Sequence, residues 1–483
     1  MSSMCPVQSF KYFRFARVPL AAWLLVASAA SFGQAAPAVS TVLAFNLPFN
    51  GSAPNGGLVE GADGGLYGTT AASNLVSGGL IYRSTVSGSS VTTLHQFALT
   101  EGYVPKAGLL KGSDELLYGS TSLGDQTVAD TPGTTFSLAQ DGTGFTILHR
   151  FEAWTTTNVY GSPKNADGAY PVAALIEGSD GFLYGVTSAG GTNGTGVIFR
   201  QPRQPVDNSD FLVLHHFGQV TSDPSVSILK NDDGASPVGG LLAASDGYLY
   251  GTASGGGVNG RGTIFRIRTD GTGFEVVHTF ADLSSGSPAT NVEGANPRSG
   301  LTDGQNGLLY GVTSAGGANG VGTLFSLDPV SGLLTVPMPH DFETANGAGP
   351  SGALTLGLDG RLYGVTASGG TDSSGTATNF GTIYSIARDG TGFTKLYSFD
   401  GTNGSSPSGS LLQLDANTFV GIAAGGGKCS GGTLFSYSST GATVVGNTTC
   451  GQKKKNQSGG GALAPGLLLL FGALGLAPRR RRD

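Results

Sequence analysis

The sequence predicts an all-β fold, a seven-bladed β-propeller built from four-stranded antiparallel blades. Glycine supplies 82 of the 483 residues, and each glycine in a helix interior costs about 1 kcal/mol relative to alanine, which excludes long helices. Charged residues make up only 12 % of the chain, about half of the usual share of about 25 %. The third observation is a Leu-Tyr-Gly motif that recurs along most of the chain.

The N-terminal segment reads as an export signal over residues 1–35. Lys11, Arg14 and Arg17 precede the apolar run 18–32, no acidic residue occurs in this segment, and small residues follow around Ala35. A basic region, an apolar region and a small-residue cleavage site together define such a signal. We therefore expect cleavage at Ala35 and export of the remaining chain.

The repeat domain is expected to span residues 41–450. Six copies of the motif place their tyrosine at Tyr67, Tyr118, Tyr184, Tyr250, Tyr310 and Tyr363, and a degenerate seventh copy is Phe419-Val420-Gly421. Repeats of this length indicate propeller blades or solenoid units. We place the units at about 55–104, 105–171, 172–237, 238–297, 298–350, 351–407 and 408–450.

The fourth unit shows why each repeat predicts a blade. Ser245-Asp246-Gly247, Asn259-Gly260 and Asp270-Gly271 separate four short runs that are rich in β-branched and aromatic residues. Asn-Gly and Asp-Gly are strong hairpin signals because a type I′ turn needs positive φ at both central residues. Three successive hairpins give a four-stranded meander, and a ring of such blades leaves only short, protected edges.

The ends of the repeat array predict how the ring closes. Residues 41–45 resemble the fourth-strand pattern of residues 146–149, whereas the last unit has only a weak fourth strand at 442–445. We therefore expect the N-terminal strand to complete the last blade. An open solenoid is the competing architecture, but it would require repeats of more constant length and specific caps.

The motifs also carry a family resemblance. Residues 183–191 with 194–199, and residues 309–317 with 320–325, resemble the GloVer tandem repeat of bacterial surface proteins. The resemblance covers about residues 55–450 and implies a surface location and a repeat array, with no established chemistry. The first unit departs from the pattern at residues 73–79, and the second carries an insertion around Asp125 and Asp130.

Two cysteines remain after the signal is removed. Cys429 and Cys450 both lie in the last unit, and an even pair in an exported chain favours a disulfide bond over a metal site.

The C-terminal segment reads as a sorting tail. A polar and glycine-rich linker at 451–461 precedes a hydrophobic helix with a basic end at 462–483. The layout resembles the GlyGly-CTERM class, whose tails are cleaved by a rhombosortase near the glycines, here Gly459, Gly460 and Gly461. Arg479, Arg480, Arg481 and Arg482 would hold the end in the cytoplasm. The alternative is a plain C-terminal membrane anchor.

Processing of both ends makes the body acidic. The signal carries three Lys or Arg and the tail carries four, together with one acidic residue, so 19 basic and 31 acidic residues remain. The net charge of the body is therefore near −12 rather than the −6 of the whole chain. A nucleic-acid partner would require the opposite sign.

The histidines and glycine loops read as structural features. Five of the six histidines, namely His95, His149, His215, His278 and His340, occupy one position of the predicted outer strand. Residues one blade apart lie around the rim, so they cannot converge on a metal or form a Ser-His-Asp triad. The loops at 190–196, 256–262 and 316–322 precede strands rather than helices, which excludes phosphate cradles.

Acidic residues occur in two places with different expected roles. Those in Asp-Gly turns, such as Asp180, are expected to bind their own backbone. A second set, which includes Asp167, Asp232 and Asp233, lies in the connections between blades, on the face that we expect to bind ligands because recognition is usually carried by loops. Calcium would accept such oxygen ligands, with these three as candidates, although no complete calcium-loop spacing occurs.

These observations lead to an expected function. We expect an exported, cell-surface or secreted protein that is non-catalytic and binds an extracellular polysaccharide or an envelope protein. No catalytic or cofactor-binding residue is assigned, and calcium is the one cofactor considered. The alternative is a secreted carbohydrate-active hydrolase or lyase that uses paired carboxylates in the central funnel. A passive coat component is a third possibility.

Overall fold

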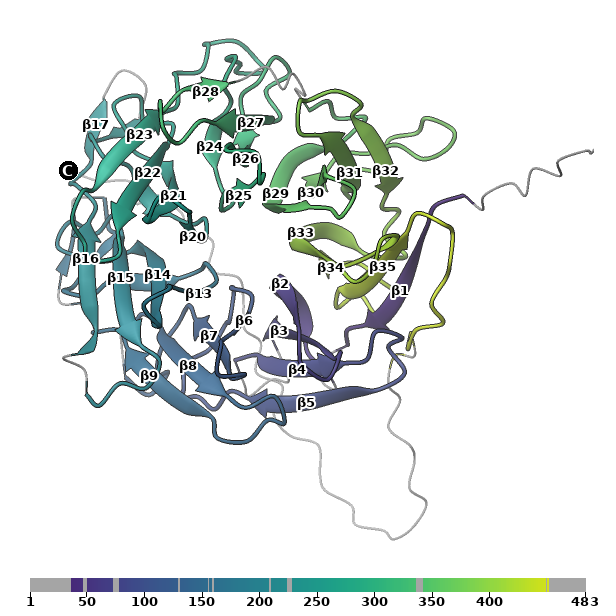
Figure 1. Cartoon of the computed structure of the whole chain (residues 1–483), viewed down its shortest axis with the longest axis horizontal. Coiled ribbons are helices and arrows are strands. Elements are labelled where there is room, and N and C mark those ends of the chain that lie inside the picture. Colours follow the sequence, from purple (N-terminus) through teal and green to yellow (C-terminus); the bar gives the residue numbers. More distant parts are fainter. Residues whose placement is uncertain are drawn as a thin grey trace, which may run out of the picture.

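A ring of small antiparallel sheets forms the body of the protein (Figure 1). The computed structural model describes residues 36–46, 50–72, 78–128, 131–154, 156–158, 160–207, 210–223, 228–335, 342–448 and 450. Seven of its sheets are blades with four principal strands each, so the predicted seven-bladed β-propeller is confirmed. The expected export signal at 1–35, the linker at 451–461 and the sorting helix at 462–483 lie outside the described residues. Within the described ranges, no helix is long and apolar enough to cross a membrane.

The first three blades contain seventeen strands between residues 52 and 230, counting two small hairpins. Blade 1 comprises β2 (Ser52–Glu60), β3 (Leu66–Ala72), β4 (Leu80–Ser84) and β5 (Val91–Gln96). Blade 2 comprises β6 (Leu110–Lys111), β7 (Leu117–Thr121), β8 (Thr134–Leu138) and β9 (Thr146–Arg150). Blade 3 comprises β12 (Ala169–Pro171), β13 (Ile176–Glu177), β14 (Phe182–Ala189), β15 (Val197–Pro202) and β16 (Leu212–His216). The connections after blades 2 and 3 contain the hairpins β10 (Thr156–Thr157) with β11 (Pro163–Lys164), and β17 (Thr221–Asp223) with β18 (Ile228–Lys230).

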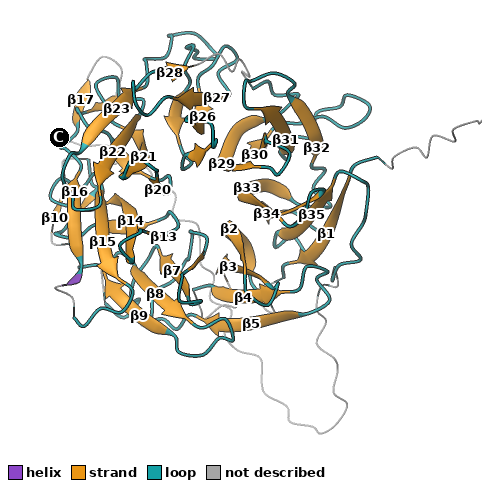
Figure 2. Ribbon diagram, in the orientation of Figure 1, coloured by secondary structure: helices purple, strands orange, loops and turns teal. Residues whose placement is uncertain are grey.

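The remaining four blades complete the ring, with each innermost strand nearest the central axis (Figure 2). Blade 4 comprises β19 (Ala235–Pro237), β20 (Leu242–Ala243), β21 (Tyr248–Gly255), β22 (Thr263–Arg268) and β23 (Glu275–Thr279). Blade 5 comprises β24 (Ala295–Pro297), β25 (Thr302–Asp303), β26 (Leu309–Ala315), β27 (Thr323–Leu327) and β28 (Leu334–Thr335). Blade 6 comprises β29 (Ala348–Leu356), β30 (Arg361–Ser368), β31 (Thr382–Ala387) and β32 (Thr394–Ser398). Blade 7 comprises β33 (Ser405–Gln413), β34 (Thr418–Gly425), β35 (Thr433–Ser438) and β1 (Ala38–Ala44).

The first strand of the chain closes the ring, as the sequence predicted. β1 pairs antiparallel with β35, from Ala38 opposite Ser438 to Ala44 opposite Thr433. The segment 442–445, expected as a weak fourth strand, forms no strand. It lies along the outer side of β1 instead, where the Val444 amide donates to Ser40 Oγ at 3.2 Å. β1 has taken the place that this segment would otherwise fill.

The Leu-Tyr-Gly motif packs each blade against its neighbour. In blade 3, a Cβ on Gly185 would lie 2.5 Å from the ring of Phe199, so only glycine leaves room for that ring. Phe199, Leu183 and Tyr118 then share one buried cluster that spans blades 2 and 3. The core of the protein is therefore a series of inter-blade clusters, and the largest fully buried side chains in it are the repeated tyrosines and phenylalanines.

The Asp-Gly turns bind both their own backbone and the motif tyrosine. Asp180 accepts a hydrogen bond from the Phe182 amide at 3.2 Å and another from the Tyr184 hydroxyl at 2.6 Å. Burial, and then the bond to Asp180, raise the pKa of Tyr184 to about 12. Turn aspartates of this kind therefore stabilise the fold, as the sequence predicted, and their carboxylates are not free to react.

The blades begin slightly earlier than the expected unit boundaries. Ala235–Pro237 pairs with the far end of β21, and Leu242–Ala243 pairs with its near end, so both belong to the innermost strand of blade 4. The boundary expected between residues 237 and 238 thus lies inside this strand. Pro237 pairs with Ala253 of β21, and it packs against Gly196 of the preceding blade, where a Cβ would lie 2.7 Å from the proline Cδ.

A disulfide bond fastens the end of the repeat domain. Cys429 and Cys450 are joined, the pairing that their even number indicated. Cys429 lies in the loop between β34 and β35. The bond therefore ties the chain end to the same blade that β1 closes.

Candidate functional site

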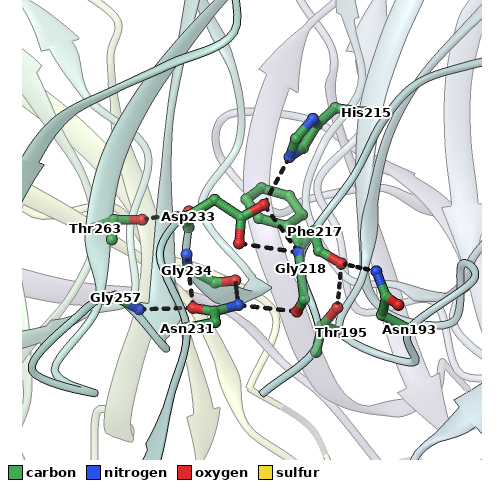
Figure 3. A network of polar contacts seen from close by, with 10 residues as sticks. All are labelled: Asn193, Thr195, His215, Phe217, Gly218, Asn231, Asp233, Gly234, Gly257 and Thr263. Carbon is green, nitrogen blue, oxygen red and sulfur yellow. Dashed lines mark hydrogen bonds and ion pairs between the residues drawn. The ribbon is translucent and has the colours of Figure 1, made fainter. Parts of the chain in front are cut away.

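One face of the propeller gathers the inter-blade connections and the loops between the second and third strands of each blade. We call this the connection face. In blade 4 the two kinds of loop are joined directly, because the Gly257 amide donates to Asn231 Oδ1 at 2.8 Å (Figure 3). Asn231 belongs to the connection before blade 4, whereas Gly257 belongs to the loop after β21. The sequence predicted that these loops share a face.

In four of the described connections a histidine and a carboxylate hold the connection against the outer strand. Asp233 accepts a hydrogen bond from His215 Nε2 at 3.0 Å and from the Gly218 amide at 2.9 and 2.8 Å (Figure 3). We call this arrangement the His–carboxylate latch. Both carboxylate oxygens are engaged, so the side chain fixes the path of the connection that leaves the outer strand.

Asn231 completes the latch from the other side. Its amide nitrogen donates to the carbonyl oxygens of Gly218 and Gly234, at 2.9 and 2.7 Å. Its oxygen accepts from the amides of Gly234 and Gly257. One side chain thus satisfies four backbone groups of loops, and buried backbone groups are costly when they are left unpaired.

The latch recurs around the propeller. Equivalent contacts from histidine Nε2 to a carboxylate oxygen are His95 to Glu101 at 2.9 Å, His149 to Asp167 at 2.8 Å and His278 to Glu293 at 3.3 Å. In the last of the connections Tyr397 replaces histidine and accepts from Asn403. His340 lies outside the described residues. The repetition indicates a scaffold role, since a catalytic base would be needed only once.

The histidine rings also pack against the next blade. His95, His149 and His215 stack on Phe145, Phe211 and Phe274, with ring centroids 3.6 to 3.7 Å apart. Burial lowers the pKa of His278, and the neighbouring Glu293 only partly opposes that shift. A neutral, packed ring is therefore the state that the fold favours at this position.

The three calcium candidates do not come together. Asp167 and Asp233 belong to different connections, and each accepts bonds from a histidine and from backbone amides. Asp232 is exposed. Among the residues that the structure describes, no group of three or more His, Cys, Asp or Glu side chains could hold a metal ion. The arrangement therefore gives calcium no support.

A central cavity of about 330 Å³ is lined by the innermost strands of all seven blades. Most of the lining is glycine and small or apolar residues, and its two charged residues are Lys106 and Arg298. No Asp or Glu is among the described residues that line this cavity. The funnel carboxylates expected for a hydrolase or lyase are therefore missing here, because the inner-strand positions that face the axis carry glycine and small residues instead.

A second hollow lies on the connection face beside blade 2. It has a volume of about 520 Å³ and is lined by Tyr103, Leu123, Asp125, Gln126, Val128, Thr131 and Trp154. We call it the aromatic pocket. Tyr103 comes from the connection before blade 2, Trp154 from the connection after it, and the other residues from the loop between β7 and β8.

The aromatic pocket combines ring surfaces with a preformed polar loop. Trp154 is partly exposed and contacts Tyr170 edge to face, with ring centroids 5.8 Å apart. Asp125 Oδ1 accepts hydrogen bonds from the Thr127 amide at 2.8 Å and hydroxyl at 2.6 Å. These bonds from Thr127 lower the pKa of Asp125. The carboxylate therefore stays ionised and holds the loop in shape.

Sequence reasoning identified the departure of this loop from the repeat but missed the aromatic residues beside it. Asp125 was singled out, and Asp130 lies outside the described residues. The signal that could have located the pocket is Trp154, the single tryptophan outside the export signal. It stands in a connection whose counterparts carry no aromatic residue at that place.

The fold and its loops define a class: a seven-bladed propeller assembled from tandem repeats, with its variable loops on one face. The chain belongs to the Gloeobacter/Verrucomicrobia repeat family, whose model matches residues 31–232, 155–291 and 225–380. This confirms the resemblance to the GloVer repeat. No curated protein matches the chain.

Solved structures also match the chain at low identity. A protein assigned as a 6-phosphogluconolactonase from Bacteroides fragilis is 15 % identical, with a TM-score of 0.44, covering 81 % of this chain and 89 % of the other. An oligogalacturonate lyase in complex with manganese is 13 % identical, with a TM-score of 0.41 and coverages of 74 % and 82 %. The extracellular domain of a protein described as a one-component system from B. thetaiotaomicron is 13 % identical, with a TM-score of 0.44 and coverages of 82 % and 39 %.

Proposed function

We propose that this protein is an exported, non-catalytic propeller that binds an extracellular polysaccharide through its connection face. The observation that carries the proposal is the aromatic pocket, in which Trp154 and Tyr103 border a loop of polar side chains. Ligand pockets typically combine apolar walls with a few placed polar groups, in volumes of roughly 300–1,000 Å³. The proposed surface location has two supports. The chain belongs to the repeat family, which we expect to consist of bacterial surface proteins, and residues 1–35 have the pattern of an export signal.

Binding fits the pocket better than hydrolysis does. Asp125 is the one carboxylate among the described residues of the lining, and its Oδ1 is already held by Thr127. Glycoside hydrolysis commonly needs two carboxyl groups about 5–10 Å apart, one of them protonated. The low pKa of Asp125 opposes the protonated form. The pocket therefore offers a surface for sugar rings without the groups that would cleave them.

The aromatic rings supply the binding surface. Aromatic side chains combine a large apolar face with little conformational entropy to lose, and the indole and phenol groups add a polar edge. Gln126 and Thr131 border the same hollow, where their amide and hydroxyl groups can pair with sugar hydroxyls. Because all of these residues come from loops on a rigid ring, recognition can vary while the fold does not.

Glycan-array binding of the full chain tests this function. We expect wild-type protein to bind at least one polysaccharide, and Trp154→Ala to weaken that binding at least about tenfold, as expected for loss of an aromatic anchor. Tyr160→Ala is the matched control, because Tyr160 is 41 % exposed on the neighbouring hairpin loop and lies outside the pocket. Equal binding by wild type and Trp154→Ala would refute the proposal, and turnover of a glycan would favour the hydrolase or lyase alternative. Capture of an envelope protein with no glycan binding would favour the other partner class.

The export and sorting steps form part of the same proposal. We infer cleavage at Ala35 and processing near Gly459, Gly460 and Gly461, with residues 462–483 as a temporary membrane segment. Mass spectrometry of the mature protein tests both ends at once. A mature chain that still ends in Arg482-Asp483 would mean that the tail is retained as an anchor.

A further inference from the structure

One residue of each blade stands at the connection-face end of the central cavity. In every blade a proline in or just before the innermost strand packs against a glycine of the preceding blade, and the residue after that proline occupies one position of the repeat. These residues are Asn55, Lys106, Val172, Val238, Arg298, Ser351 and Ser408. Six of the seven line the cavity, all except Ser351. At this position the repeat therefore places residues of differing type around the cavity in six of the seven blades.

The charge of this ring is opposite to that of the body. Lys106 and Arg298 are exposed, and neither has an acidic partner within ion-pair distance among the described residues. They belong to blades 2 and 5, nearly across a ring of seven blades. No acid is among the described residues that line the cavity, although the chain as a whole has a net charge of −6. Two unpaired cations thus face a space from which the surrounding acidic surface is excluded, and such a focused field attracts anions.

Unused hydrogen-bond donors lie in the same cavity. Ser299, which follows Arg298, is 4 % exposed, and its hydroxyl has no hydrogen-bond partner. The hydroxyl of Ser408 is likewise buried without a partner, and both residues line the cavity. Buried hydroxyls are nearly always paired. Both hydroxyl oxygens are covered by protein atoms, so they border the cavity as donors that only a turn of the serine side chain would direct toward a bound group.

We propose that the central cavity is an anion-binding site in which Lys106 and Arg298 hold a carboxylate, sulfate or phosphate group. Charge-assisted bonds of this kind are roughly twice as strong as neutral ones. The cavity volume of about 330 Å³ suits a small molecule or one acidic residue at the end of a chain. The site is separate from the aromatic pocket and goes beyond the proposed function.

The two sites lie close enough to serve one ligand. Tyr103 lines the aromatic pocket and Lys106 lines the central cavity, three residues further along the same segment. Three residues of extended chain span at most about 10 Å. A polysaccharide bearing acidic groups could therefore contact both sites, whereas a neutral polysaccharide would use the aromatic pocket alone.

Calorimetric titration of the full chain with simple anions tests the site. The probes are glucuronate, inorganic sulfate and inorganic phosphate, with neutral glucose as the ligand control. We expect at least one anion to bind with one-to-one stoichiometry, to bind more weakly as salt rises, and to lose at least about tenfold in affinity in the double variant Lys106→Gln/Arg298→Gln. The anion that binds most tightly identifies the chemical source.

The matched control is Lys164→Gln/Lys428→Gln. It removes two positive charges from loops of the same face, and neither residue lines the cavity. We expect its affinity to stay within about twofold of wild type. If no anion binds, or if both double variants lose affinity equally, the site is refuted. Because the probes are simple anions, this outcome is independent of whether a polysaccharide binds the aromatic pocket.

Discussion

Blade 4 and blade 2 have the same four-stranded architecture, but their loops on the connection face differ. In blade 4 the glycine loop is closed by Asn259, which donates to the Phe280 carbonyl at 2.9 Å. Asn193 and Asn319 do the same in blades 3 and 5. In blade 2 the corresponding loop closes on itself, through the Thr131 hydroxyl and the Asp125 carbonyl at 2.8 Å. The repeated residues thus build the scaffold, and a pocket forms where one blade departs from them.

This comparison predicts that changes to repeated positions affect stability and that changes to the irregular loop affect binding alone. The largest stability effect is expected at glycines of the innermost strands, where the backbones of neighbouring blades come very close to each other. A Cβ on Gly352, whose φ is +76°, would lie 2.1 Å from the Gly409 carbonyl oxygen of the next blade. We expect Gly352→Ala to lower the free energy of unfolding by about 3 kcal/mol or more, measured by urea denaturation.

Gly375 is the matched control for that variant. Its φ is +84°, but a Cβ there would meet nothing within 4 Å. Gly375→Ala therefore adds only the backbone strain of a left-handed alanine, about 1–2 kcal/mol. Similar losses in both variants would show that the close approach between blades 6 and 7 contributes little.

Loss of the disulfide is expected to cost nearly as much. The bond between Cys429 and Cys450 closes a sequence separation of 21 residues, which corresponds to roughly 3 kcal/mol on the chain-entropy model. We expect Cys429→Ser/Cys450→Ser to lower the thermal midpoint while leaving glycan binding at blade 2 intact. An unchanged midpoint under oxidising conditions would contradict this expectation.

Disruption of one latch should have a smaller effect. Asp233→Ala removes the acceptor for His215 and for the Gly218 amide, and leaving such donors unpaired costs about 1–3 kcal/mol. The neighbouring Asp232 is exposed, so Asp232→Ala should change stability by no more than about 0.5 kcal/mol. Chemical denaturation of both variants measures the difference, and calcium should not alter either value.

The smallest expected effect is a pH dependence at His278. Because burial lowers its pKa in the fold below the unfolded value of 6.5, the unfolded chain binds more protons between the two values. The free energy of unfolding should therefore fall as pH drops from neutral through that window. Unfolding curves at successive pH values should show a shallower slope for His278→Gln, and an identical slope would mean that another group controls this range.

The sequence predicted the features that repetition makes visible. The six motif tyrosines and Val420 in the seventh copy indicate the number of blades. Asp-Gly pairs indicate the turns, and residues 41–45 predict the closing strand. The latch was invisible because His215 and Asp233 belong to different elements 18 positions apart, and only the path of the connection brings them together. The inner-strand start was misplaced because Pro237 looks like the end of a loop.

The candidate sites were harder to predict for a physical reason. Lys106 and Arg298 follow equivalent prolines, so an alignment of the repeats with one another could have placed both at the axis. The residues of the aromatic pocket cannot be aligned between repeats in this way, because Tyr103 and Trp154 lie in connections of different length. Loops that differ between repeats have no equivalent in the other repeats to which they could be compared. Only the folded ring therefore shows which of their side chains meet.

The way in which the ring closes also delays the completion of folding during synthesis. Ser40 and Val444, which meet at the closing strand, are separated by 404 residues. At a synthesis rate of about 5–20 residues per second, β1 waits roughly 20–80 s for its partner strand to emerge. Throughout that interval the unfinished ring presents open sheet edges, which are prone to pair with other chains. The ring therefore stays open, and its sheet edges stay unprotected, until the last blade has been synthesised.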